Sequence, residues 1–283
     1  MSDTDSASRK EVRLLSRDSF GRRRSVLNTY TSYQLIAKDI PKALDQVEAQ
    51  PVVKRDTDYY LANIGNVKTI DDFVKDTRLF TYAMKAFGLG DMAYAKAFMV
   101  KALKEGVADE DSFANKLTDK RYAEFVKAFN FAAYDDTATL FPAAQQGTVD
   151  KYMRQTLEEN AGETNEGVRL ALYFDRKASS ITNWYDVLAD TALASVVRNA
   201  LGLPDSFASA DIDKQAQAFE QKLDIADFAD PEKLSKFLTR FTSMWEINNP
   251  TSTAQTSVSV LFAQPTTVGI STDLMMAMQK LRF

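Results

Sequence analysis

The chain has 283 residues, a net charge of −4 and a pI near 5.1, and it contains no histidine and no cysteine. It therefore lacks the side chain that titrates nearest neutral pH, the thiolate nucleophile, and the nitrogen and sulfur ligands of zinc sites. Any acid–base chemistry would depend on carboxylates, lysines or tyrosines. We expect no enzyme activity, no metal and no cofactor, and the acidic balance argues against nucleic acid as a partner.

The remaining composition favours helices. Hydrophobic residues make up 45% of the chain, with 18 Phe and 11 Tyr, whereas Gly and Pro number only 10 and 7. No run approaches the roughly 18 apolar residues of a membrane-spanning helix. The N-terminus also lacks the apolar stretch of a cleaved signal peptide. We predict an all-α protein that is cytoplasmic as synthesised, with export by a route that reads no cleaved signal as the alternative.

Residues 1–25 differ from the rest of the chain. They carry seven basic and four acidic side chains, a charge of +3, so that the other 258 residues carry −7. We interpret this segment as a disordered basic extension. The alternative is a basic arm that touches a membrane or nucleic acid.

Apolar spacings of three and four residues predict the first helices. One N-terminal helix is expected over residues 26–50, kinked or restarted at Pro41. A second helix is expected from Pro51 to Gly65. The inward residues expected in these helices are Tyr33, Ile36, Ile40, Leu44, Val47, Val53, Tyr60 and Ile64.

The next helices are marked by their ends. A capping-box-like start at Thr69 and a stop at Gly88 predict one helix with Phe73, Leu79, Phe80, Met84 and Phe87 inward. Asp91 is expected to cap another helix, which runs to Gly106 with Tyr94 on its core face. Further helical pattern follows, with Phe113, Leu117, Phe125, Phe129 and Phe131 inward.

A self-match is the most informative pattern. Residues 72–91 match residues 186–205 without a gap, 114 positions later, and eight of the 20 positions are identical. The identical pairs are Asp72/Asp186, Asp76/Asp190, Thr77/Thr191, Leu79/Leu193, Ala86/Ala200, Gly88/Gly202, Leu89/Leu203 and Asp91/Asp205. Tyr59 aligns with Tyr173 at the same offset. Downstream, the match is interrupted by residues 224–231.

This period is too long for a stacked solenoid and predicts two pseudo-symmetric multi-helix subdomains related by an internal repeat, roughly 51–131 and 165–246. The expected organisation along the chain is the extension 1–25, a helix in 26–50, helical repeats 51–147 and 148–250, and a terminal part 251–283. The shared glycines are interpreted as helix C-caps with positive φ, and Asp91 and Asp205 as N-caps.

Two groups of carboxylates are candidates for chemistry. Asp76 and Asp190 are repeated and are expected in mid-helix, where we interpret each as capping a neighbouring backbone or pairing with a nearby cation; the alternative is that the two form a cation or acid–base pair. Residues 224–230 space three aspartates by three, but lack the Gly and alternation of a calcium loop. We interpret them as the start of a helix at Pro231.

The C-terminal part combines a predicted extended segment with a predicted amphipathic helix over 271–283. The apolar face of this helix, which is the predicted partner-binding site, consists of Leu274, Met275, Met278 and Leu281. Methionine-rich faces adapt to irregular partners. The alternative is that this helix docks onto its own core.

Segments 29–33, 72–91, 112–122 and 269–282 together resemble an uncharacterised family of alphaproteobacterial proteins that are encoded among flagellar genes. The resemblance covers residues 26–283. It implies association with the flagellum and protein partners among flagellar components, and it brings no site residues with it.

Three functions follow as hypotheses. The first is a non-enzymatic structural or interaction protein of flagellar assembly or export. The second is a cytoplasmic helical adaptor or chaperone that binds a partner helix. The third and least favoured is a carboxylate-based enzyme. The sequence leaves the oligomeric state open.

Overall fold

The computed structural model describes residues 28–249, and within that range every regular element is an α-helix or a short 3-10 helix. The predicted all-α class is confirmed. No described helix is long and apolar enough to cross a membrane. The basic extension 1–25 and the predicted partner-binding face (Leu274, Met275, Met278 and Leu281) lie outside the described residues.

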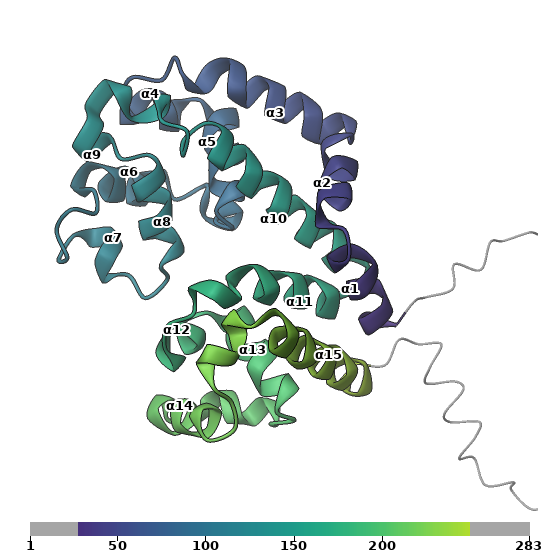
Figure 1. Cartoon of the computed structure of the whole chain (residues 1–283). Helices are drawn as coiled ribbons and strands as arrows, with labels where there is room; N and C mark the ends of the chain where they lie inside the picture. Colours follow the sequence, from purple (N-terminus) through teal and green to yellow (C-terminus); the bar gives the residue numbers. More distant parts are fainter. Residues whose placement is uncertain (1–27, 250–283) are drawn as a thin grey trace, which may run out of the picture.

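The described chain has two hydrophobic cores, which form the upper and lower lobes in Figure 1. The first lobe is built around the first core by consecutive helices. These are α2 (Ile40–Glu48), α3 (Pro51–Ile64), α4 (Ile70–Lys75), α5 (Thr77–Ala86), η1 (Gly90–Met92), α6 (Lys96–Glu105), α7 (Phe113–Lys116), α8 (Arg121–Ala128), α9 (Phe131–Tyr134), η2 (Asp135–Leu140) and α10 (Gln146–Thr164).

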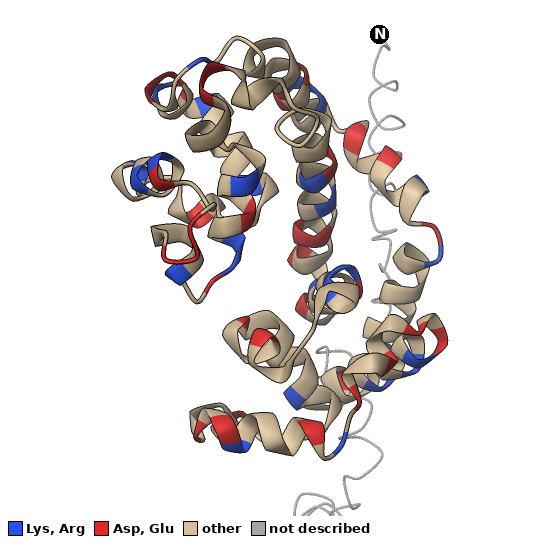
Figure 2. Cartoon of the chain, turned by 60° about the vertical axis from the view of Figure 1, so that its left-hand side comes forward, with Lys and Arg blue, Asp and Glu red and all other residues tan. Residues whose placement is uncertain are grey.

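The second lobe combines the first helix of the described chain with the last ones. Its elements are α1 (Thr29–Ala37), α11 (Glu166–Lys177), η3 (Ala178–Ser180), α12 (Trp184–Ala189), α13 (Thr191–Ala200), η4 (Asp205–Ser209), α14 (Ile212–Glu220), η5 (Ile225–Ala229) and α15 (Pro231–Asn248). Figure 2 shows acidic and basic residues interspersed over both lobes rather than separated by sign.

The break expected at Pro41 within the N-terminal helical region 26–50 is confirmed, because α1 ends at Ala37 and α2 begins at Ile40. Asp39 caps α2 with its carboxylate, and Pro41 fits the first turn of α2, where no backbone N–H is needed. The break lets the expected apolar stripe serve both lobes. Tyr33 is buried in the second core and Val47 in the first.

Helix α10 connects the lobes. Its residues Val149, Tyr152, Met153 and Leu157 belong to the first core, so this core extends past the boundary expected at residue 147. The neighbouring helix α11 begins directly after Asn165 and packs along α10. The contact between α10 and α11 is therefore the main seam between the two lobes.

A buried charge cluster lies in this seam. Glu158 of α10 is only 2% exposed and accepts hydrogen bonds from two arginines. Arg154 Nε lies 3.1 Å from Glu158 Oε1, while Arg176 of α11 donates to both carboxylate oxygens at 2.7 and 2.8 Å. Arg154 also donates to the Leu172 carbonyl at 3.1 Å. One carboxylate thus joins α10 to α11 through geometry that offsets the cost of burying its charge.

The segments that match in the sequence make the same local interactions. Asp76 accepts from the backbone N–H groups at the start of α5, and the Tyr59 hydroxyl donates to its other oxygen at 2.8 Å. Asp190 does the same at the start of α13 with the hydroxyl of Tyr173. Neither aspartate is in mid-helix as expected, but each caps a helix, as we interpreted from the sequence.

The repeated glycines also match in geometry. Gly88 and Gly202 have φ of +70° and +66°, and the N–H of the next leucine bonds five residues back, from Leu89 to Met84 and from Leu203 to Arg198. This is the hydrogen-bond pattern of a helix end that reverses through a left-handed residue. The wider expectation of two pseudo-symmetric halves stays a prediction.

The expected roles of Asp91, Asp205 and Tyr94 are wrong. Asp91 and Asp205 lie in the first turns of η1 and η4, which have no side-chain cap. Helix α6 starts only at Lys96, so that Tyr94 precedes it in a turn and is 80% exposed. A 3-10 turn that uses backbone bonds has replaced the capped helix start that the sequence suggested.

Replacing Glu158 by alanine should strongly destabilise the fold, because Arg154 and Arg176 would keep their charges in the seam without an acceptor. We expect a loss of roughly 3 kcal/mol in the free energy of unfolding, near the lower end for breaking a buried pair since Arg176 retains access to water. Asp58→Ala, which removes an exposed partner of Lys54, should cost about 0.5 kcal/mol or less. Equal losses for both variants in urea denaturation would contradict the role of the seam.

Replacing Gly202 by alanine should cost about 1–2 kcal/mol, because a Cβ is strained at positive φ. The matched control is Gly90→Ala, where φ is not positive and the nearest atoms to an added Cβ lie 3.8 Å away. This control should change the stability by about 0.5 kcal/mol or less. Denaturation curves of the two variants measure the difference, and a neutral Gly202→Ala would refute the assignment of this helix end.

Candidate functional site

Three surface hollows of the described chain lie around one short element, η5. They are lined in turn by Ala226 to Glu232, by residues of α12, α14 and η5, and by residues of α1, α11, η5 and α15. Segment 224–231, which contains η5, is also where the second copy of the sequence match departs from the first. The surface around η5 is therefore the candidate for a functional site.

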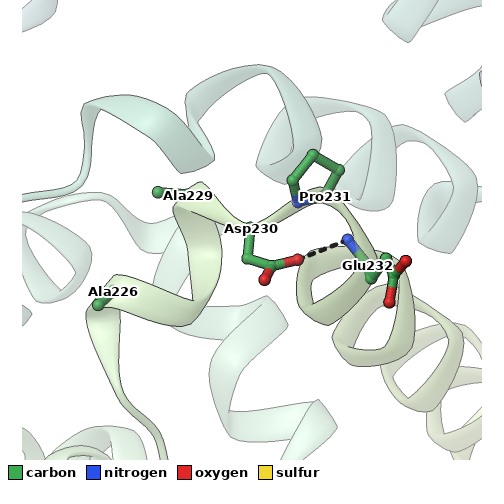
Figure 3. Close-up of a pocket in the computed structure, with 5 residues that line it drawn as sticks. All are labelled: Ala226, Ala229, Asp230, Pro231 and Glu232. Carbon is green, nitrogen blue, oxygen red and sulfur yellow. Dashed lines mark hydrogen bonds between the residues drawn. The ribbon is translucent and has the colours of Figure 1, made fainter.

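The hollow beside the start of α15 is explained by helix capping. Asp230 points its carboxylate at the N-terminus of α15 and accepts from the backbone N–H groups of Glu232 and Lys233 (Figure 3). Pro231 occupies the first turn. The interpretation of residues 224–230 as the start of a helix at Pro231 is confirmed for Asp230, whose carboxylate already has its partners, whereas residues 225–229 form the separate turn η5.

The second hollow is a groove of about 880 Å³ between α12, α14 and η5, which we name the α12–α14 groove. Its floor is apolar and aromatic. Trp184, 7% exposed, packs edge-on against Phe219 and Phe228 with ring centroids 5.7 and 6.0 Å apart. Leu223 and Ile225 complete the apolar lining. A volume of this size falls within the range of clefts that hold small ligands or side chains of a partner.

The wall of the groove contains an exposed aromatic side chain. Tyr185 is 52% exposed, although it is a large side chain on a lobe with a well-packed core. Its hydroxyl donates to Asp213 Oδ1 at 2.9 Å, which joins α12 to α14 across the groove. Exposed tyrosines of this kind combine apolar contact area with a polar tip, and they are enriched where proteins bind other proteins.

The rim of the groove is acidic. Of its lining residues, Asp213, Glu220, Asp224 and Asp227 are acidic and Lys222 is basic, which gives a charge of −3. Asp224 caps η5 and Asp227 pairs with Lys233, whereas Glu220 has no hydrogen bond or ion pair to any described residue. A rim of this sign over an apolar floor is complementary to a segment that carries both basic and apolar side chains.

The hydroxyl groups that line the groove are engaged by neighbouring carboxylates. The lining residues include no lysine beside a serine, and the hydroxyls of Thr182 and Tyr185 donate to Asp186 and Asp213. Among residues 28–249 no group of three or more acidic side chains could hold a metal ion.

The third hollow, of about 310 Å³, lies between α1, α11 and α15, and the ionisable groups that line it are the hydroxyl of Tyr33 and the carboxyl of Asp175. Burial raises the pKa of Asp175; Arg154, 3.8 Å away, partly offsets this, and Glu158 adds to it. Burial and the nearby Asp175 raise the pKa of Tyr33 far above its ordinary value. These groups belong to the edge of the charged seam between the lobes.

The structure separates the candidates predicted from the sequence. Asp76 and Asp190 lie in different lobes, and each is engaged by a helix N-terminus and a tyrosine. They do not form one site. Residues 224–230 border the groove through Asp224 and Asp227.

Sequence reasoning missed the groove itself. The available signal was a difference between the matched segments: Trp184 and Tyr185 occupy the positions of Ile70 and Asp71, 114 residues earlier. An aromatic pair thus appears only in the second copy, close to the insertion that forms η5.

The fold and the groove define a two-lobed helical protein with an acidic, aromatic surface groove. The chain belongs to a family described as proteins of unknown function (DUF1217), whose model matches residues 86–234, just over half of the sequence. The predicted membership of an uncharacterised family is confirmed. Its expected flagellar gene context stays a prediction.

A solved structure supports the fold. The chain is similar to a protein from Agrobacterium tumefaciens whose X-ray crystal structure was determined by a structural genomics consortium. The sequences are 55% identical, the TM-score is 0.73, and the match covers 78% of this chain and 94% of the other. No curated protein matches the sequence.

The raised pKa of Asp175 predicts a pH-dependent gain from Asp175→Asn. Because the folded state favours the protonated carboxyl, the wild type loses stability as the pH rises through the pKa of folded Asp175. The asparagine variant avoids this loss, so it should have the higher Tm at pH 7, and the difference should shrink toward pH 4. Asp45→Asn, at an exposed position of α2, is the control. A constant or reversed difference would contradict the assignment.

Proposed function

We propose that this protein is a non-enzymatic interaction protein of flagellar assembly or export, and that its α12–α14 groove binds a basic, partly apolar segment of a protein. The observation that carries the binding part is the groove, with an apolar floor under a rim of charge −3. Its Trp184 floor and exposed Tyr185 are of the residue types that dominate binding energy at protein interfaces. The flagellar part rests on the resemblance of the sequence.

A cytoplasmic adaptor is the second candidate, and the same groove favours it. A helix of a partner can lie in a groove between two helices with its apolar side chains downward and its basic side chains on the acidic rim. The two candidates differ in where the protein goes. The first predicts the protein in the medium or filament fraction of flagellated cells and its loss there in an export mutant, whereas the adaptor remains inside.

The methionine-rich face of Leu274, Met275, Met278 and Leu281 is a second predicted contact with partners. These four residues lie outside the described part of the chain.

The groove is tested by complementation of a deletion strain. A groove variant, Asp213→Asn/Glu220→Gln/Asp224→Asn, removes three negative charges but keeps oxygen atoms that cap η5 and accept from Tyr185. Its matched control, Asp45→Asn/Glu48→Gln/Asp71→Asn, removes three exposed charges from the first lobe. We expect the wild type and the control to restore swimming and filament number, and the groove variant to restore less than half of either.

Immunoblots at equal cell density check that the variants accumulate alike. Normal motility in the deletion strain would contradict the flagellar role, and full complementation by the groove variant would contradict the role of the groove.

A further inference from the structure

We propose that residues 9–17 of the chain itself dock in the α12–α14 groove, so that the protein covers its own binding site. This inference rests on the proposed function of the groove. It names the first occupant of that site and makes its availability to other proteins subject to competition.

The charge and polarity of residues 9–17 complement those of the groove. Residues 9–17 read Arg-Lys-Glu-Val-Arg-Leu-Leu-Ser-Arg, with four basic and one acidic side chain and hence a charge of +3. The lining residues of the groove carry −3. The apolar side chains Val12, Leu14 and Leu15 are interspersed with the basic ones, which complements a floor of Trp184, Leu223 and Ile225 under an acidic rim.

The chain length selects this segment among the basic residues. Thr29 is anchored to the C-terminal turn of α15, because its backbone N–H and its hydroxyl both donate to Glu246. The other end of α15 follows η5, which lines the groove. Since α15 has 18 residues, these two points are about 27 Å apart.

Reach then separates the basic residues into two sets. An extended chain covers roughly 3.3 Å per residue, so Arg17, 12 residues before Thr29, reaches about 40 Å from the anchor, and Arg9 reaches about 66 Å. Arg24, five residues before Thr29, reaches only about 16 Å and cannot pass the length of α15. Arg22, Arg23 and Arg24 therefore form a built-in control: they are basic and close in sequence, but they are tethered too near the anchor.

The C-terminal segment fits the groove less well. Residues 271–283 carry two basic and one acidic side chain, a charge of +1, against the rim of −3. It is the competing occupant in the test.

The absence of cysteine from the chain allows a direct distance measurement. Spin labels on Ser8→Cys and Ser206→Cys report the distance from the segment to η4, which contacts α14 through Phe207 and Phe219. A label on Ala133→Cys in the first lobe replaces the second one as a control. In the full-length chain at low salt we expect a narrow, short distance for the Ser8–Ser206 pair and a broad distribution for the Ser8–Ala133 pair.

If residues 9–17 dock through their charges, the short Ser8–Ser206 distance should depend on salt and on the charged residues of both partners. Roughly 1 M salt, which reduces the screening length to about 3 Å, should abolish it. The groove variant and Arg9→Gln/Lys10→Gln/Arg13→Gln should each abolish it as well, whereas Arg22→Gln/Arg23→Gln/Arg24→Gln should leave it unchanged. Reversing the charges on both sides, with Asp213→Lys/Glu220→Lys and Arg9→Glu/Arg13→Glu, should restore it.

Several results would overturn the proposal. These are a broad Ser8–Ser206 distribution under all conditions, a short distance that the substitutions at Arg22–Arg24 destroy, and a short distance that dilution with unlabelled protein removes, since the last would place the segment of a second copy in the groove. A short Ser271–Ser206 distance in place of the Ser8–Ser206 one would assign the groove to the C-terminal segment.

The two proposals fail separately. A groove variant that loses motility without any Ser8–Ser206 contact in the wild type would leave the proposed function standing and remove the docking segment. A short Ser8–Ser206 distance in a protein whose groove variant complements fully would leave the docking of residues 9–17 standing and remove the proposed function of the groove.

Discussion

One buried carboxylate joins the two lobes of the fold. Glu158 lies in the seam between the lobes, and its two oxygens accept from Arg154 on its own helix and from Arg176 on the next. Burying a charge is costly unless every oxygen is paired, so this geometry holds α10 and α11 in one register. Each core then packs on its own side of that helix pair, and the orientation of the second lobe, with its groove, follows from it.

The same local devices build both lobes, and the groove arises where they differ. A tyrosine hydroxyl and two backbone N–H groups engage Asp76 in the first lobe and Asp190 in the second, and a glycine with positive φ ends the following helix in each. These repeated residues serve the helix ends. The second lobe alone has Trp184, Tyr185 and the extra turn η5, and these elements enclose the groove.

The helical periodicity of the sequence predicted much of the core. It did not predict the turns that connect the helices or the groove, which only the structure shows. Tyr60, Phe73, Phe80 and Phe125 were expected inward and are fully buried, because helical spacing reports directly on one face. Asp91 was assigned to a helix start that a backbone-bonded 3-10 turn occupies, a choice that spacing does not reveal. The groove joins residues 28 and more positions apart, such as Tyr185 and Asp213, and no local pattern encodes that contact.

The central claim is that the α12–α14 groove is the surface through which this protein contacts a basic segment. In-cell photocrosslinking tests it most directly, with a photoreactive amino acid in place of Gln217, which lines the groove, and in place of Lys104, an exposed residue of α6 in the first lobe. The account predicts crosslinks from position 217 to peptides rich in basic residues, identified by mass spectrometry, and none from position 104. No crosslink at position 217, or equal yields of the same peptides at both positions, would contradict it.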